Sequence, residues 1–313
     1  MFTGLEKCAK IGGLNAKTMK LKLSGALLFL FSVLIIVSCG PKKPKGDDQP
    51  GFDEPKKDLG SEIQDMTQKC VPKPSEIPYL IQATGAEYNQ SLINDRRKAD
   101  SYASQSDKAA MNLGGYSADI AYLSSYDKTQ EAINHLNVCK GLADKLGVSA
   151  TFDQKLLQEF EKNIGNKDKL AQLLDSASNK TGDLLKQGNQ KLAALMVTGS
   201  FIESLYIATG IIKTYPKDML PDDQRNRILT PVIQIIIKQE CSVSEISKVL
   251  SSAEQTGSVP TIVADLKQLQ ESYGKLGAVK DQIAKGSTKS ILNDQTIADI
   301  TAVVEKLRGD MVK

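Results

Sequence analysis

Apolar residues recur at intervals of three and four along most of the chain, which is the spacing of the buried face of an α-helix. One clear stripe contains Leu136, Cys139, Leu142 and Leu146, and Gly147 ends it as a C-cap glycine would. Similar stripes lie at 156–164 before Gly165, at 170–185, and at 297–307 before Gly309. No stretch alternates convincingly at period two. The pattern predicts an all-α fold, a bundle of about nine to ten helices.

Two helix starts are marked by their capping residues. Ser242 and Glu245 have the spacing of a capping box, which predicts that a helix begins there. Ser258 and Pro260 predict the cap and early proline of a longer helix. Its apolar seam has a near-heptad spacing, suited to long antiparallel neighbours. The seam consists of Ile262, Leu266, Leu269, Tyr273, Leu276, Val279 and Ile283.

Two helical stretches differ from the rest. Residues 192–212 contain one charged side chain, Glu203. The stretch is long enough to cross a membrane, but Glu203 at its centre would cost roughly 3 kcal/mol there. We therefore expect a central helix enclosed by other helices. In residues 222–240, Pro231 is expected to kink the helix or divide it in two.

An apolar run near the amino terminus has the layout of a secretory signal. Residues 26–37 are apolar apart from Ser32, and Lys17, Lys20 and Lys22 precede them. A helix that spans a bilayer needs about 20 apolar residues, so this run is too short. Basic residues, a short apolar run and small residues after it are typical of an export signal.

Residues 36–39, Ile-Val-Ser-Cys, resemble the bacterial lipobox. The resemblance implies cleavage between Ser38 and Cys39, and attachment of lipid to Cys39. The alternatives are an ordinary signal peptide, or a buried hydrophobic helix in which the cysteine is incidental. Because Met19 and the residues after it would make a typical lipoprotein start, we expect translation to begin at Met19.

Composition divides the chain into three parts: a signal peptide at 1–38, a tether at 39–60 and a helical domain at 61–313. Residues 39–59 contain four prolines, five lysines and five acidic residues, with few apolar side chains. Such a segment cannot bury enough surface to fold, which predicts a disordered, flexible tether. The breaker-rich stretch 214–223 could separate two helical lobes.

Net charge argues against a nucleic-acid partner. The chain carries a formal charge of +3, but the predicted leader holds five lysines and one glutamate. Removing the leader leaves a mature chain of about −1, without a polybasic patch for nucleic acid.

Three cysteines lie in the predicted domain: Cys70, Cys139 and Cys241. An odd number leaves at least one thiol free unless a partner supplies the mate. Cys70 and Cys241 lie at expected helix ends, and an export compartment permits oxidation. A bridge between them is therefore one option, left open by the sequence, and Cys139 is expected in the core.

Residues for common catalytic chemistry are scarce. His135 is the single histidine, with no cysteine pair or acidic cluster at metal-ligand spacing, so we expect no metal and no cofactor. A Ser-His-Asp or Cys-His hydrolase would have to use His135 as its base. Gly114 and Gly115 lack the Lys-Ser/Thr that follows in a phosphate-binding loop. The chain is therefore not expected to be an enzyme.

One polar cluster is a candidate site. Tyr116, Asp119 and Tyr126 lie close together in sequence, with Tyr122 to one side, and Glu203 with Tyr206 could face them from the central helix. A buried carboxylate needs hydroxyl or amide donors. Three interpretations stay open: a network that fixes helix register, a polar ligand pocket, or catalysis by a Glu203 of raised pKa.

Three longer segments resemble a known family. The runs GGYSADIAYLSSYDKTQEAINHLNVCKGLADKLGV, FEKNIGNKDKL and GSFIESLYIATGI are similar to an uncharacterised family of helical lipoproteins from Bacteroidetes. The likeness covers roughly residues 88–212. It implies a Gram-negative envelope address and a helical fold, but it supplies no activity and no functional residues.

These features predict a membrane-anchored periplasmic lipoprotein, a non-enzymatic helical module that engages envelope proteins. Gly40 stands where enteric bacteria place the aspartate that retains lipoproteins at the inner membrane. An outer-membrane anchor, on the periplasmic face, is therefore expected. The main alternative is a small-ligand binding or sensing bundle built around the Tyr/Asp/Glu cluster.

Overall fold

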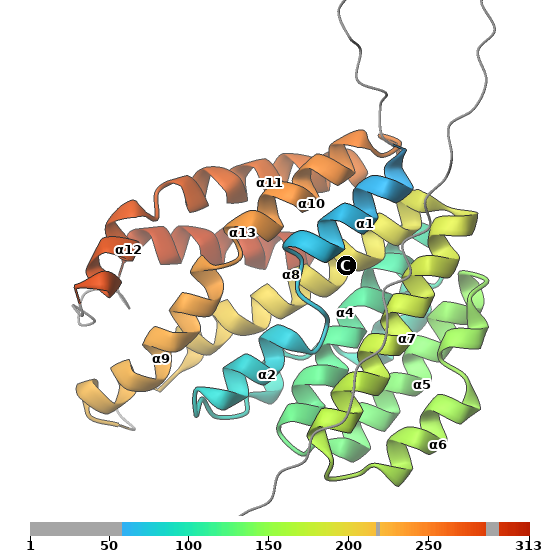
Figure 1. Ribbon diagram of the computed structural model, residues 1–313, viewed down its shortest axis with the longest axis horizontal. Helices are drawn as coiled ribbons and strands as arrows, with labels where there is room; N and C mark the ends of the chain where they lie inside the picture. The colour runs from blue at the N-terminus through green and yellow to red at the C-terminus, as the bar shows by residue number, and fades with distance from the viewer. Residues whose placement is uncertain (1–57, 217–219, 286–293) are drawn as a thin grey trace, which may run out of the picture. The chain divides into compact units, whose positions relative to one another are not determined.

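The computed structural model describes residues 58–216, 220–285 and 294–313 (Figure 1). All of these residues belong to one compact unit with its own hydrophobic core, which is what a domain needs to fold by itself. The predicted signal peptide, the tether up to residue 57, and Ser38 and Cys39 lie outside the described residues.

The described residues contain thirteen α-helices and three short 3-10 helices, and no strand. The fold is all-α, as the sequence predicts. The α-helices are α1 (Leu59–Lys69), α2 (Glu76–Ala83), α3 (Ala99–Tyr102), α4 (Ser106–Ser125), α5 (Thr129–Lys145), α6 (Gln154–Lys162), α7 (Lys167–Gly188), α8 (Gln190–Thr214), α9 (Asp222–Ile237), α10 (Glu240–Ser252), α11 (Val259–Gly274), α12 (Gly277–Ala284) and α13 (Gln295–Met311). The 3-10 helices are η1 (Gln90–Leu92), η2 (Arg96–Lys98) and η3 (Ser149–Thr151).

The predicted number of helices is too low. Twelve of the α-helices have eight residues or more, compared with about nine to ten expected from periodicity. One cause is that the seam through residues 262–283 belongs to two helices, α11 and α12, which meet at Lys275 and Leu276. Another is the short helix α2, which has no sequence counterpart because eight residues give little periodic signal.

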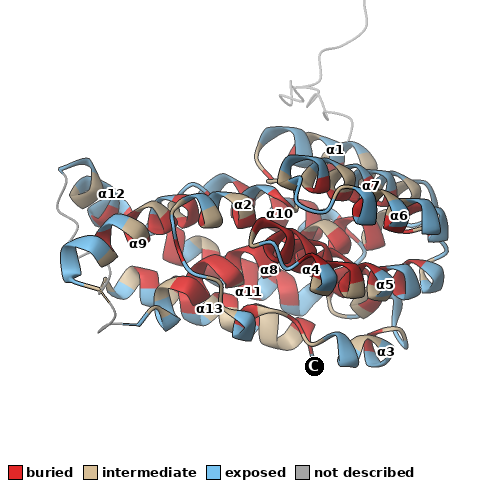
Figure 2. Ribbon diagram, turned by 90° about the horizontal axis from the view of Figure 1, so that it is seen from below, coloured by how far each residue is buried: buried red, intermediate tan, exposed pale blue. Residues whose placement is uncertain are grey.

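Helix α8 is the centre of the fold. It packs against α1, α2, α4, α7, α9, α10 and α13. Figure 2 shows buried residues around both α8 and α4, while the outer helices carry exposed residues on their solvent faces. α8 is the one helix in the described part that is long and apolar enough to cross a membrane, but 83% of its apolar window is buried inside the fold. The expectation of an enclosed central helix is therefore confirmed.

Glycines let α4 and α8 approach until their backbones touch. A Cβ atom at Gly114 would overlap the carbonyl oxygen of Met196, and one at Gly199 would overlap that of Met111. Neither carbonyl can move without distorting its helix. The two glycines therefore fix where α4 crosses α8, and with it the alignment of polar groups further along both helices.

The helical part is not divided into two lobes at residues 214–223. α8 before this stretch packs directly against α9 after it, and both helices belong to the same compact unit. The central position of α8 explains this, because its neighbours come from both sides of the stretch.

Predicted helix ends agree with the structure at one glycine and differ from it elsewhere. Gly147 follows the C-cap of α5 with φ 75°, as predicted. Gly309 was expected to end the last helix, but α13 continues to Met311. Pro231 lies inside α9, which is continuous to Ile237. The proline therefore does not divide the helix, and the other predicted outcome, a kink, stays a prediction.

Two other boundaries also differ. Asp58 accepts a hydrogen bond from the backbone N–H of Ser61 (3.2 Å) and caps α1, so Leu59 and Gly60 belong to the first helix rather than to the tether. Ser242 does not begin a helix, because α10 begins at Glu240. The Ser242 hydroxyl instead donates to the carbonyl oxygen of Cys70 (2.9 Å).

Candidate functional site

Three helices bring ionisable side chains together in the interior. Asp119 on α4 and Glu203 on α8 are both fully buried. Arg308 on α13 faces Glu203, with Nε 3.3 Å from Oε2 and Nη2 3.3 Å from Oε1. The contact is bidentate, the geometry in which a guanidinium binds a carboxylate most strongly.

Asp119 and Glu203 are a pair of buried carboxyl groups that influence each other's pKa. Burial, and then the negative charge of Glu203, raise the pKa of Asp119 well above its ordinary value. Burial also raises the pKa of Glu203, while Arg308 opposes that rise. Asp119 Oδ1 has no hydrogen-bond partner in the structure. We infer that Asp119 keeps its proton and donates it to Glu203, which is ionised against Arg308.

Hydrogen bonds of Asn94 and Asn112 connect this pair to the carboxyl-terminal residues. The backbone N–H of Asn94 donates to Asp119 Oδ2 (3.2 Å), and the Asn94 side chain donates to Asn112 Oδ1 (3.0 Å). Asn112 in turn donates to the carbonyl oxygen of Met311 (2.8 Å). The Tyr102 hydroxyl donates to the carbonyl oxygen of Val312 (3.1 Å). The network therefore holds the end of α13 against α4 and the loop before η2.

Tyr206 belongs to this site through Arg308. The guanidinium carbon of Arg308 lies 4.6 Å from the centre of the Tyr206 ring, within the range of a cation–π contact. Arg308 is thus held between the carboxylate and the ring, both of which α8 supplies.

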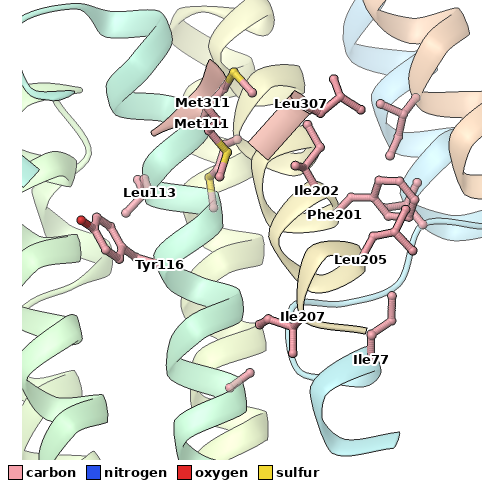
Figure 3. Packing of buried hydrophobic residues seen from close by; sticks show 14 of the residues in the cluster. Ile77, Met111, Leu113, Tyr116, Phe201, Ile202, Leu205, Ile207, Leu307 and Met311 are labelled. Carbon is pink, nitrogen blue, oxygen red and sulfur yellow. The ribbon is translucent and has the colours of Figure 1, made fainter. Parts of the chain in front are cut away.

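Tyr116 and Tyr126 lie in other groups. Tyr116 points away from α8 (Figure 3), donates its hydroxyl to the carbonyl oxygen of Asp95 (3.0 Å), and packs its ring against His135 at 5.7 Å. Tyr126 donates to the carbonyl oxygen of Ala86 (2.7 Å) and packs against Tyr122 at 5.0 Å.

The five-residue cluster expected from sequence is therefore divided. Asp119, Glu203 and Tyr206 meet, while Tyr116 and Tyr126 do not join them. The reason is helix geometry: Tyr116 is about 60° around α4 from Asp119, and Tyr126 is about 10 Å further along the axis.

Sequence reasoning missed Arg308, although a signal was present. Ile300, Val304 and Arg308 are spaced by four, so Arg308 occupies a position on the apolar stripe of α13 where only its charge is unusual. A charged residue on such a stripe requires a buried partner. Its partner is 105 positions away in the sequence, and periodicity does not identify a partner at that distance.

His135 is a buried residue with a backbone carbonyl oxygen near each ring nitrogen. Nδ1 lies 2.8 Å from the carbonyl oxygen of Glu131, and Nε2 lies 3.4 Å from that of Asn94. Burial lowers the pKa of the ring. Within the described residues, no group of three or more His, Cys, Asp or Glu side chains could hold a metal ion.

The polar network does not open into the main cavities. Three surface cavities of about 640, 460 and 470 Å³ lie in the described part of the chain, and none of them is lined by Asp119, Glu203 or Tyr206. The geometry of the network is that of a contact that fixes the register of α4, α8 and α13.

A disulfide joins Cys70, at the end of α1, to Cys241 in α10, with the Cα atoms 5.7 Å apart. This is the pairing that the sequence left open. Cys139 is a free thiol buried in the core. The bond, together with the adjacent Ser242 contact, fixes the first helix to a helix from the second half of the chain.

Comparisons of the chain with family models, with curated proteins and with solved structures found no match. The similarity to helical lipoproteins of Bacteroidetes thus stays a prediction from sequence.

Proposed function

We propose that this protein is a lipoprotein, anchored through Cys39 at the periplasmic face of the outer membrane. We further propose that its helical domain binds other envelope proteins and catalyses no reaction. The observation that carries the proposal is the position of Cys39, at the end of an apolar run and directly before a segment rich in prolines and charges. Two or three acyl chains bind a membrane stably, because each buried methylene contributes ~0.8 kcal/mol.

The Cys70–Cys241 disulfide supports an exported location. Disulfides form and persist in oxidising compartments such as the periplasm, and they are rare in the cytosol. A cytosolic chain would keep both thiols reduced and lose the covalent link between α1 and α10.

The state of the buried carboxyl groups supports a binding role over a catalytic one. Asp119 and Glu203 are the strongest candidates for acid–base chemistry, because burial raises the pKa of each. Both are fully buried and are engaged with each other and with Arg308, which leaves neither carboxyl group available to a substrate.

Metabolic labelling with radioactive palmitate tests the anchor. We expect label on the wild-type chain and none on Cys39→Ala, whereas Cys139→Ala, which removes the free cysteine of the helical domain, should label normally. Equal labelling of wild type and Cys39→Ala would show that the anchor is elsewhere.

In-cell cross-linking followed by mass spectrometry tests the binding role separately. The wild-type protein should yield specific envelope partners, and Cys39→Ala should yield fewer because it is not held at the membrane. Recovery of no protein partner under any growth condition would contradict the interaction role while leaving the anchor intact.

A further inference from the structure

The largest of the three surface cavities lies between α1, α7 and α8. Its volume of about 640 Å³ is within the usual range for small-ligand sites, about 300–1,000 Å³. One wall is α1 with the segment that follows it, the other is α7, and α8 forms the floor. The Cys70–Cys241 bond fixes the α1 wall at its carboxyl end. The cavity is separate from the Asp119–Glu203 network.

Small and aliphatic side chains line the apolar part of this cavity. Ile63 and Val71 contribute from one wall, and Ala193, Met196 and Val197 contribute from the floor. None of the lining residues is aromatic, so there is no ring on which a sugar or a flat heterocycle would stack. Methionine adapts its shape to irregular apolar groups. This lining suits a flexible aliphatic chain.

One buried hydroxyl in the cavity wall lacks a partner. Ser178 on α7 is 6% exposed, and its Oγ makes no hydrogen bond in the structure. A buried hydroxyl without a partner is unfavourable, so a hydroxyl or ester group of a ligand would be stabilised beside Ser178. The amide side chains of Gln64 and Asn179, also in the wall, offer further donors and acceptors.

The charges around the cavity favour an uncharged ligand. Lys186 and Asp183, which both line the cavity, form an ion pair with Nζ 2.9 Å from Oδ1. Lys73 is the one further charged side chain in the wall, and it is exposed to solvent. A carboxylate or ammonium group placed on the apolar floor would lose its hydration without gaining a buried counter-ion.

We propose that the cavity between α1, α7 and α8 is a binding site for an uncharged amphiphile, an aliphatic chain that carries one hydroxyl or ester head group. This site goes beyond the anchoring role, since it depends neither on Cys39 nor on a protein partner.

The test uses the chain without its first 39 residues, which retains the whole compact unit. The probe is 1-decanoylglycerol, kept below its micelle concentration, and the comparator is decanoate, which has the same chain with a charged head. Binding is followed by NMR of ¹³C-methyl methionine, with the Met196 signal assigned through Met196→Leu. We expect a saturable one-to-one shift of Met196 with 1-decanoylglycerol, and affinity about tenfold or more weaker for decanoate.

Gly182 provides a variant that fills the cavity. It lines the space, and a Cβ atom built on it meets no atom within 4 Å. Gly182→Leu should therefore fold normally and weaken binding about tenfold or more, since its side chain occupies the ligand volume. Gly141, on α5, also has an open Cβ position and lines none of the three cavities, so Gly141→Leu is the matched control and should bind like wild type.

Ser178→Ala tests the polar contact and should weaken binding of 1-decanoylglycerol roughly fivefold to tenfold. The proposal is overturned if 1-decanoylglycerol leaves Met196 unshifted, if Gly182→Leu binds as tightly as Gly141→Leu, or if decanoate binds as well as the uncharged ester. Binding of an extended peptide in place of 1-decanoylglycerol would equally overturn it.

Discussion

Arg308 forms a bidentate ion pair with Glu203, a residue 105 positions earlier in the chain, with both N···O distances at 3.3 Å. Because Glu203 is fully buried, the pair joins the last helix to the central one in the interior of the fold. The same carboxylate is the group to which we infer that Asp119 donates its proton, so one charge on α8 interacts with both α4 and α13.

Removal of Arg308 should destabilise the fold strongly. In Arg308→Met, Glu203 loses its counter-ion while it stays buried, and the free energy of unfolding should fall by about 3 to 5 kcal/mol. Urea unfolding followed by circular dichroism measures this. Adding Glu203→Gln to Arg308→Met should recover roughly half of the loss, because the stranded charge is then removed.

The matched control for that change is Arg227→Met. Arg227 pairs with Asp223 on the surface, where the side chains are 73% and 71% exposed. Exposed pairs contribute little, so the unfolding midpoint should hardly change. A comparable loss in Arg227→Met and Arg308→Met would contradict the assigned role of the buried pair.

Asp119→Asn should reproduce the protonated state of Asp119. An amide can donate to Glu203 and still accept from the backbone N–H of Asn94, so the variant should be at least as stable as wild type at neutral pH. Asp119→Leu keeps the branched shape without the hydrogen bonds and should be destabilised, by about 1 to 3 kcal/mol. Thermal unfolding at pH 7 compares the two, and equal destabilisation by both changes would argue against a neutral Asp119.

The pH dependence of stability has a predicted sign. The folded-state pKa of Asp119 is raised, so the folded chain binds this proton more tightly than the unfolded chain. The tighter binding of this proton stabilises the folded chain fully below the unfolded-state pKa of about 4. This stabilisation declines as the pH rises toward the folded-state pKa. Wild type should therefore lose up to about 1.4 kcal/mol per pH unit in this window relative to Asp119→Asn. If wild type instead became more stable relative to Asp119→Asn as the pH rises, Asp119 would not hold a proton in the folded chain.

How much of this arrangement the sequence predicts depends on distance along the chain. The burial of α8 follows from residues 192–212 alone, and the candidate status of Asp119 and Glu203 follows from the cost of burying them. The contact with Arg308 does not follow, because periodicity shows which face of a helix is buried but not which helix covers it. The crossing at Gly114 and Gly199 cannot be predicted for the same reason, because the sequence does not show which backbone packs against a glycine.

The glycine crossing gives a further prediction. Gly114→Ala places a methyl group onto the Met196 carbonyl, so α4 and α8 must separate, and stability should fall by about 3 kcal/mol or more. Gly141→Ala puts the same methyl group into open space on α5 and should stabilise by about 0.5 to 1 kcal/mol. Differential scanning calorimetry compares the melting temperatures of the two variants with that of wild type. A Gly114→Ala chain as stable as wild type would contradict the close crossing of α4 and α8.

The disulfide encloses a long segment, with 171 positions between its cysteines. A bond that closes so long a loop restricts the unfolded chain strongly, and its loss should reduce stability by about 2 to 5 kcal/mol. Dithiothreitol should therefore lower the melting temperature of wild type and leave Cys70→Ser/Cys241→Ser unchanged. If the reductant has no effect on wild type, the bond does not support the fold.

Mass spectrometry of the amino-terminal peptide of the protein purified from its native membrane tests the central claim most directly. The proposed function predicts a chain that begins at Cys39 and carries a diacylglyceryl group on its sulfur and an acyl group on its amino nitrogen. A mature chain that retains residues before Cys39, or one that begins there without lipid, would contradict it.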